Sequence, residues 1–118
     1  MEKNPTYLFV AAAALVDRNG RILVQKRPEG KPMAGLWEFP GGKVEPGETP
    51  EAALVRELNE ELTIDVEGPA LEPVAFASEA VEDQHLILLL YICRDCLTAS
   101  PTMPNRRMRR HHSLKASC

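Results

Sequence analysis

Three glutamates that lie close together in the sequence, Glu57, Glu60 and Glu61, have a spacing that could support metal chemistry. At positions i, i+3 and i+4 of a helix, three carboxylates lie on one face within a single turn. Like charges repel there, and carboxylates are disfavoured near the negative end of a helix dipole. A hard cation such as Mg²⁺ relieves both penalties, because it prefers oxygen ligands and keeps waters for chemistry. The spacing alone leaves two interpretations open, a metal site and a solvated helix face.

The residues that precede these acids favour the metal site. Gly41 and Gly42 can bring the backbone close to a ligand, as phosphate-binding loops require. Glu48 stands at the entrance of a predicted helix, and Arg56 comes directly before the first acid. Arg56 would either orient the carboxylates or form an ordinary helix salt bridge, and both interpretations stay open. The segment as a whole predicts a phosphate-handling site that holds a divalent metal.

The acids need a helix, and the sequence contains strong signals for one. Thr49 is a good N-cap residue, Pro50 suits the first helical position, and Glu51 places an acid in the first turn. Apolar residues follow at a spacing near 3.6, which is typical of a helix with one buried face. These residues are Ala53, Leu54, Leu58 and Leu62. We therefore predict a helix from about Pro50 to Leu62.

Apolar runs on either side of this helix predict β-strands. Tyr7–Val16 and Arg21–Lys26 flank Asn19-Gly20, which predicts a hairpin because both turn residues tolerate positive φ. Tyr7–Val16 also has the length of a signal-peptide apolar region, but no basic cluster precedes it, which favours the hairpin. The other predicted strands are Leu36–Phe39, ended by Pro40-Gly41-Gly42, then Leu71–Ser78 and His85–Cys93. The last of these is nearly all aliphatic, so we expect it at the centre of a sheet.

Length and charge limit the class of protein. The chain has 118 residues and a formal net charge of −3, which suits about one soluble domain. Residues 97–118 contain five basic residues and no acid, whereas residues 1–96 contain nine basic and 17 acidic residues. An acidic body argues against nucleic-acid binding by bulk attraction, and no apolar run is long enough to span a bilayer. We predict one domain over residues 1–96 and a basic tail over residues 97–118, with little order from Thr98 onward.

The segment that contains the acids also resembles a known motif. Gly42 to Ile64 is GKVEPGETPEAALVRELNEELTI, which resembles the Nudix box, G-x5-E-x7-R-E-U-x-E-E-x-G-U, with U a bulky aliphatic residue. Thr63 stands where the pattern has Gly. The matching residues are Gly42, Glu48, Arg56, Glu57, Leu58, Glu60, Glu61 and Ile64. The similarity extends over about residues 7–95, which resemble the MutT branch of the family, hydrolases that remove oxidised guanine triphosphates.

The resemblance implies a fold and a reaction. The fold class would be α/β (α+β), an α/β/α sandwich around a mixed β-sheet. The reaction would be hydrolysis of a nucleoside diphosphate linked to another group, and a triphosphate such as 8-oxo-dGTP would give the monophosphate and pyrophosphate. The alternatives are a different nucleoside diphosphate derivative and a weakly active or non-catalytic nucleotide-binding form. We expect a cytoplasmic enzyme with a nucleotide substrate, without a nucleic-acid duplex or membrane partner, and either monomeric or homodimeric.

The same resemblance implies roles for the acidic residues. Glu57 and Glu61 would be the principal ligands of Mg²⁺, with Mn²⁺ as the alternative metal, and Glu60 would share the site. Arg56 would orient these carboxylates by pairing with an acid, for which Glu48 is the candidate. With several acids converging, one would act as a base, and spacing does not decide which one.

Backbone atoms and substrate contacts would complete the site. The carbonyl of Gly41 would add an oxygen to the metal. The residues expected at the substrate are Arg27, Phe39, Gly42, Asp83 and His85. Arg27 stands where MutT-like proteins place an Arg toward the nucleotide, and Phe39 could flank the base; a solvated Arg and a core Phe are the alternatives. Asp83 and His85 begin a strand that faces the nucleotide pocket in relatives, and a simple polar strand end is the alternative.

Two features depart from the family's pattern. The Gly that Thr63 replaces would supply a left-handed residue at the helix end. A β-branched residue there would cost about 1 kcal/mol if φ stays positive, and the alternative is that the chain turns differently. From Leu97 onward the sequence has no acid, no aromatic residue and no apolar periodicity. MutT-like chains continue there with a strand and a closing helix, so we expect these elements to be missing or divergent and the site to be incomplete.

The chain has an odd number of cysteines, and all three lie near its end: Cys93, Cys96 and Cys118. Secreted disulfide scaffolds pair their cysteines throughout the fold, so this distribution favours a reducing compartment. Cys93-x-x-Cys96 followed by His111-His112 is superficially similar to a zinc set, but adjacent histidines do not have the usual ligand spacing. We therefore prefer a buried Cys93 and an incidental Cys96 over a zinc site.

Overall fold

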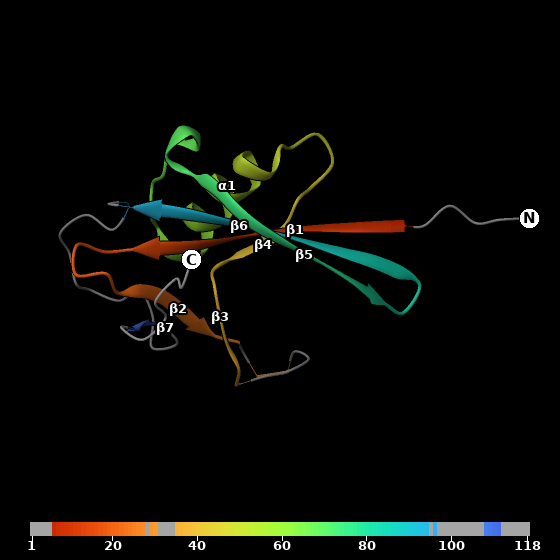
Figure 1. Cartoon of the computed structure of the whole chain (residues 1–118), viewed down its shortest axis with the longest axis horizontal. Coiled ribbons are helices and arrows are strands. Elements are labelled where there is room, and N and C mark those ends of the chain that lie inside the picture. Colours follow the sequence, from red (N-terminus) through yellow and green to blue (C-terminus); the bar gives the residue numbers. More distant parts are fainter. Residues whose placement is uncertain (1–5, 28, 31–34, 95, 97–107, 112–118) are drawn as a thin grey trace, which may run out of the picture.

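The computed structural model describes residues 6–27, 29–30, 35–94, 96 and 108–111. Within these residues it contains seven strands, one α-helix and a short 3-10 helix. Their bounds in chain order are β1 (Thr6–Val16), β2 (Ile22–Lys26), β3 (Trp37–Glu38), β4 (Gly41–Lys43), α1 (Pro50–Leu62), η1 (Gly68–Ala70), β5 (Glu72–Val81), β6 (Gln84–Arg94) and β7 (Met108–His111). Figure 1 shows that α1 lies beside the middle of the sheet, while the turn between β5 and β6 extends away from it.

The sheet has the strand order β3-β2-β1-β6-β5, with β1 at its centre. Strands β1 and β6 run parallel along their whole length, from the Thr6–Gln84 pair to the Val16–Arg94 pair. The other pairings are antiparallel, including β4 with β1 and β7 with β2. The sheet is therefore mixed, as predicted, and the aliphatic strand β6 lies between two neighbours.

The predicted hairpin between β1 and β2 is confirmed. Val16 pairs with Ile22, and the amide of Gly20 donates to the carbonyl of Asp17 at 3.0 Å. The Asp17 carboxylate accepts hydrogen bonds from the backbone amides of Asn19 and Arg21, each at 2.9 Å. These contacts satisfy turn amides that have no partner in the strands.

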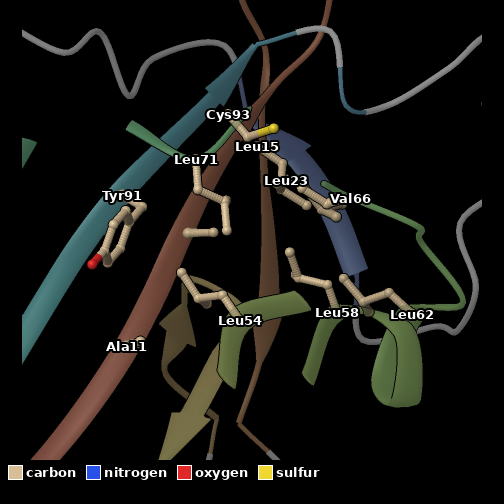
Figure 2. Close-up of a cluster of buried hydrophobic side chains, with 11 residues drawn as sticks. Ala11, Leu15, Leu23, Leu54, Leu58, Leu62, Val66, Leu71, Tyr91 and Cys93 are labelled. Atoms are coloured by element: carbon tan, nitrogen blue, oxygen red, sulfur yellow. The ribbon is translucent and has the colours of Figure 1, made fainter. Parts of the chain in front are cut away.

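Helix α1 has the predicted bounds and the predicted cap. The hydroxyl oxygen of Thr49 accepts a hydrogen bond from the Ala52 amide at 3.1 Å. The apolar face of α1 packs on β1 and β6, as Figure 2 shows. The core cluster consists of Ala11, Ala13, Leu15, Leu23, Leu54, Leu58, Leu62, Val66, Leu71, Tyr91 and Cys93. Each buried Leu contributes about 1.5–3 kcal/mol relative to an exposed position, so this face holds α1 in place.

One polar contact also ties the start of α1 to the sheet. The Tyr91 hydroxyl donates to a carboxylate oxygen of Glu51 at 2.9 Å. Burial and this contact with an acid raise the pKa of Tyr91 to about 12, so the hydroxyl keeps its proton at neutral pH. The bond therefore fixes the first turn of α1 against β6.

The two faces of the central strands have different neighbours. Because side chains alternate along a strand, Ala11, Ala13 and Leu15 face α1, whereas Leu8 and Val10 point to the opposite face. The register places Leu86 of β6 beside Leu8, on that same opposite face. Within the described part of the chain, the α-helix covers only one face, so the second helical layer implied by the resemblance is not seen there.

Two strands lie where the sequence indicated none. Gly41–Lys43 was expected to end a strand, but it forms β4 because its backbone pairs with Val10–Ala12 of β1. Met108–His111 lies in the tail that was expected to have little order, but it forms β7 along β2. Both strands depend on main-chain hydrogen bonds to a distant segment, which the side-chain pattern of a short run does not reveal. The rest of the expected tail lies outside the described residues.

The end of α1 follows the expectation for a left-handed residue. Thr63 has φ 56° and ψ 34°, and its amide donates to the carbonyl of Asn59 at 3.0 Å. The amide of Ile64 reaches back to the Leu58 carbonyl at 3.2 Å, which closes the last turn. A β-branched residue in this conformation costs about 1–2 kcal/mol, and the buried face of α1 offsets that cost.

Cys93 and Cys96 are joined by a disulfide, with Cα atoms 5.9 Å apart. Cys93 is buried, as expected, but Cys96 is not incidental, because the end of β6 brings the two side chains together. The paired sulfurs are not thiolate ligands, so in this state they do not form the zinc set that the CxxC spacing suggested. Across the described residues, no helix combines the length and the apolar character that a membrane crossing needs.

Candidate active site

A pocket of about 930 Å³ extends from the acidic end of α1 to the face of β1 and β6 that the helix does not cover. Its lining comes from β1, β2, β3, β4, α1 and β6. We name two parts of it. The carboxylate side consists of Gly41, Gly42, Glu57 and Glu61, and the aliphatic side consists of Leu8, Val10, Leu86 and Leu88.

The two glycines of the carboxylate side allow close approach of backbone and side chain. A Cβ at Gly41 would collide with the Ala11 carbonyl oxygen and lie 2.7 Å from the Cα of Ala12. A Cβ at Gly42 would lie 2.6 Å from the Glu57 carboxylate. These glycines therefore let β4 pair tightly with β1 and leave the room that the Glu57 side chain occupies.

Glu57 and Glu61, one turn apart on α1, converge in this pocket. Burial of the Glu61 carboxyl in the pocket, its hydrogen bond with Glu57 and the negative charge of Glu57 raise the pKa of Glu61 to about 7. The hydrogen bond from Gln25 acts in the opposite direction and favours the ionised form. Two carboxylates this close together form a site where a divalent cation would relieve their repulsion.

Arg56 is the centre of an ion-pair network beside the pocket. Its Nε and Nη2 atoms donate to the two Glu48 oxygens at 2.7 and 2.9 Å, a bidentate pair. Its Nη1 donates to Glu57 at 2.9 Å and to Glu60 at 3.4 Å, and Nη2 also reaches the Lys43 carbonyl at 3.2 Å. The hydrogen bonds from Arg56 and the Glu45 amide lower the pKa of Glu48 to about 2. The pairs with Glu48 and Glu57 raise the pKa of Arg56, which therefore stays charged and fixes Glu57.

Glu60 has a different position from the other two acids of its motif. Its side chain is 60% exposed and points to Arg56, and it is not among the residues that line the pocket. In the described ranges, no three His, Cys, Asp or Glu side chains are gathered as a preformed metal cluster. The structure thus brings Glu57 and Glu61 together. Glu60 lies at the edge of the pocket and is connected to Glu57 through Arg56, which pairs with both acids.

Three of the expected substrate residues, Arg27, Phe39 and Gly42, line the pocket. Arg27 donates from Nη1 to Glu38 at 3.1 Å, and both side chains are about one-third exposed. Phe39 lines the pocket and also packs against the small cluster of Ile22 and Val24. Phe39 therefore packs in the core and also lines the pocket, and its contact with a base stays a prediction. The Arg27 guanidinium is already paired, so a phosphate would have to share it with Glu38.

Asp83 and His85 lie away from the pocket. Asp83 is an exposed residue in the turn between β5 and β6. His85 is close to Ser78, 2.5 Å from its hydroxyl, and packs edge-on against the Tyr7 ring at 6.0 Å. By alternation along β6, the side chain of His85 points to the face opposite that of Leu86 and Leu88. Their expected place at the substrate came from the resemblance to MutT-like proteins, and in this structure neither residue is among those that line the pocket.

The sequence analysis missed several residues that line the pocket. Gln25 and Glu38 are directly paired across β2 and β3, and Gln25 reaches Glu61. The four residues of the aliphatic side were assigned only to strands. Alternation within the predicted runs could have grouped Leu8 with Val10 and Leu86 with Leu88, but the β1–β6 register was needed to place them together.

The donor set fits a hard divalent cation. Mg²⁺ is usually held by one or two carboxylates, with waters and substrate phosphates completing its shell. Glu57 and Glu61 supply two carboxylates, and a cation would relieve the repulsion between them. Because Gly42 has no side chain, there is room for the Glu57 carboxylate beside it. Gly41 lines the same side and could add its carbonyl oxygen.

Comparisons with known proteins agree with this geometry. Residues 6–113 match the family model described as the NUDIX domain. The 8-oxo-dGTP diphosphatase of Proteus vulgaris is 42% identical over 86 residues, which cover 72% of this chain and 74% of that protein. The CTP pyrophosphohydrolase of Escherichia coli (strain K12) is 58% identical over 58 residues, 49% of this chain and 43% of that protein. The chain thus matches less than half the length of the second relative.

Solved structures show the same similarity. The solution structure of the E. coli ORF135 protein superposes with a TM-score of 0.65 and 36% identity, covering 92% of this chain and 69% of that one. The crystal structure of a MutT NUDIX hydrolase from Burkholderia pseudomallei superposes with a TM-score of 0.70 and 31% identity, covering 90% and 78%.

Proposed function

Because this chain belongs to the Nudix family and is a Nudix hydrolase, we propose that it hydrolyses a nucleoside triphosphate to the monophosphate and pyrophosphate. The first candidate substrate is 8-oxo-dGTP, the substrate in the name of the 42% identical relative. The proposed role is sanitation of the nucleotide pool in the cytoplasm. The observation that carries the proposal is the meeting of the Glu57 and Glu61 carboxylates and an aliphatic surface in one pocket.

The carboxylate side would hold the metal. Glu57 and Glu61 would be its ligands, with the Gly41 carbonyl as a third oxygen. When bound, Mg²⁺ would neutralise phosphate charge and make a coordinated water more acidic. Arg56 holds Glu57 through its 2.9 Å ion pair and is itself held by Glu48, so the Glu57 carboxylate keeps its orientation without a substrate. Glu60 would support this network through Arg56.

The reaction would break one P–O bond. Water adds to phosphorus, the bond between the α- and β-phosphates breaks, and pyrophosphate leaves. The proton of the attacking water would pass to one of the glutamates of the site, which would act as the base. Arg27, once it turns from Glu38, would pair with a phosphate oxygen.

The other part of the pocket would receive the nucleoside. Leu8, Val10, Leu86 and Leu88 form an apolar surface against which a planar base can pack, with Phe39 at the lining as well. This surface favours a nucleoside-containing substrate over inorganic pyrophosphate, because bound pyrophosphate would leave the apolar side chains in contact with water.

The test is release of pyrophosphate or monophosphate from a panel of nucleotides, with and without Mg²⁺. The panel contains 8-oxo-dGTP, dGTP, CTP and ADP-ribose. We expect Mg²⁺-dependent hydrolysis of a triphosphate and a loss of at least about 100-fold in kcat for Glu61→Gln. Glu67→Gln is the matched control, since it removes one exposed carboxylate outside the pocket. Glu60→Gln shows whether the acid at the edge also joins the metal.

Each outcome separates the alternatives. Undiminished hydrolysis by Glu61→Gln would refute the site assignment. Preference for ADP-ribose would retain the family reaction and change the substrate class. Nucleotide binding without hydrolysis of any member of the panel would support the non-catalytic alternative.

A further inference from the structure

Gln25 is a polar residue of the pocket to which the proposed function gives no role. It lies in β2, directly paired with Glu38 of β3, and its side chain lines the pocket. Its amide nitrogen Nε2 donates to Oε2 of Glu61 at 3.4 Å. A residue of β2 therefore contacts an acid on the last turn of α1, across 36 positions of the sequence.

Glu61 needs such a contact more than Glu57 does. Arg56 and the neighbouring Gly42 fix the place of the Glu57 carboxylate. Glu61 as a residue is exposed at the end of the helix beside Leu62, although its carboxyl is partly desolvated in the pocket, and it lies near the negative charges of Glu57 and Glu38. Repulsion from these acids and the rotamer freedom of a glutamate both favour turning the carboxylate out to solvent.

The chemistry of an amide suits this task. A primary amide is neutral, so its N–H can hold a carboxylate oxygen and leave the negative charge available for a cation. A lysine or arginine at the same place would compete with the cation for that charge. Only Oε2 of Glu61 accepts this hydrogen bond. The other oxygen, Oε1, is oriented by the same bond because it belongs to the same carboxylate.

We propose that Gln25 is a positioning residue, which holds the Glu61 carboxylate in the pocket and so prepares the cation site. This inference rests on the proposed function for its catalytic consequence, but its structural content concerns cation binding alone. It predicts that the side-chain amide of Gln25 acts through Glu61 and not on the nucleotide.

The test is Mn²⁺ binding, followed by electron paramagnetic resonance without nucleotide, in the whole chain. Gln25→Met keeps the length of the side chain and removes the amide. Loss of one hydrogen bond to a carboxylate at this long distance should weaken Mn²⁺ binding about fivefold. Lys26→Gln is the control, since this exposed residue is the next one on β2 and is not part of the pocket lining. A thermal melt of each variant reports whether the fold is intact.

A double-mutant cycle separates positioning from general support of β2. In a Glu61→Gln background, Gln25→Met should cause no further loss of Mn²⁺ affinity, because the residue it acts through has already changed. With nucleotide present, Gln25→Met should lower kcat and leave KM unchanged.

Three results would overturn the inference. They are wild-type Mn²⁺ affinity in Gln25→Met, an equal loss in the Glu61→Gln background, and a raised KM with unchanged Mn²⁺ affinity. A wild-type chain that binds Mn²⁺ but hydrolyses no nucleotide would refute the proposed function only, and the Mn²⁺ titrations would still decide the role of Gln25. A wild-type chain that binds no Mn²⁺ would refute both.

Discussion

The carboxylate side and the aliphatic side of the pocket are built in different ways. On the carboxylate side, Glu57 and Glu61 come from one helix turn, and Arg56 binds Glu57 and Glu48 at 2.7–2.9 Å. On the aliphatic side, Leu8 and Leu86 lie next to one another only because β1 and β6 pair in parallel register. The first side is held by directional polar contacts within a short segment, and the second by the pairing of two distant strands.

This difference predicts different consequences of substitution. Hydrogen bonds and ion pairs fix positions to fractions of an ångström, and cation binding depends on such positions. Apolar contact is non-directional and falls in proportion to the area lost. Changes on the carboxylate side should therefore act steeply on kcat, and changes on the aliphatic side should act mildly on KM.

The largest effect is expected for Gly42→Ala. The new methyl group would lie 2.6 Å from the Glu57 carboxylate, so one of them must shift. We expect a loss of about 100-fold in kcat with little change in the melting temperature, because a shift of about 1 Å in a catalytic group has that effect. Gly68→Ala is the control, since its added methyl would meet no atom within 4 Å. Equal kcat values for the two variants would contradict the tight packing described for Glu57.

A smaller effect is expected for Leu88→Ala on the aliphatic side. Removal of part of the apolar surface should raise KM about fivefold and leave kcat unchanged. Ile87→Ala is the matched control, because Ile87 is also partly buried but points to the other face of β6. Steady-state kinetics of both variants test the comparison directly. A fall in kcat for Leu88→Ala, or an equal rise in KM for Ile87→Ala, would contradict the difference proposed between the two sides of the pocket.

The Arg56 network gives a prediction about pH. Hydrogen bonds from Arg56 and the Glu45 amide lower the pKa of Glu48 to about 2 from its usual value of 4.5. Because the folded pKa is below the unfolded one, the stabilisation is complete above pH 4.5 and is lost as pH falls toward 2. Glu48→Gln should therefore melt at a lower temperature than wild type at pH 7, with the gap narrowing below pH 4.5. A gap that stays constant with pH would show that Glu48 is not held ionised by Arg56.

The smallest effect is expected for His85→Ala. His85 contacts Ser78 and Tyr7 on the face opposite the pocket-lining leucines of β6. Steady-state constants should change by less than about twofold, as for substitutions away from a site. A large rise in KM would mean that the turn between β5 and β6 contacts the substrate, as the sequence analysis expected.

Sequence alone predicted the carboxylate side better than the aliphatic side, because the carboxylate side lies within a short segment and the aliphatic side depends on two distant strands. Thr49, Pro50 and the spacing of Leu54, Leu58 and Leu62 encode α1 locally, so its bounds and its buried face were predicted correctly. Even the left-handed conformation of Thr63 follows from its place at the helix end. The roles of the individual acids remain predictions.

Apart from the Cys93–Cys96 disulfide, the parts that sequence did not predict depend on pairing between distant segments. The backbone of Gly41–Lys43 forms a strand only because Ala11 and Ala12 lie beside it. Likewise, β7 exists through its register with β2, and Gln25 meets Glu61 only once β2 has been placed near α1. His85 was assigned to the correct strand, but a shift of one residue decides the face, and no local signal fixes that choice.

The parallel pairing of β1 with β6 also has a consequence for the order in which the chain is completed. During synthesis, β1 emerges first, whereas its partner emerges only after α1 and β5 have been made. Until then, one whole edge of the alanine-rich run FVAAAALV can pair only with the wrong strand or with another nascent chain. Closure of this long loop is slow because its entropy must be lost before the contacts form. The central strand of the sheet is thus made before β6 and remains without that partner until β6 has emerged.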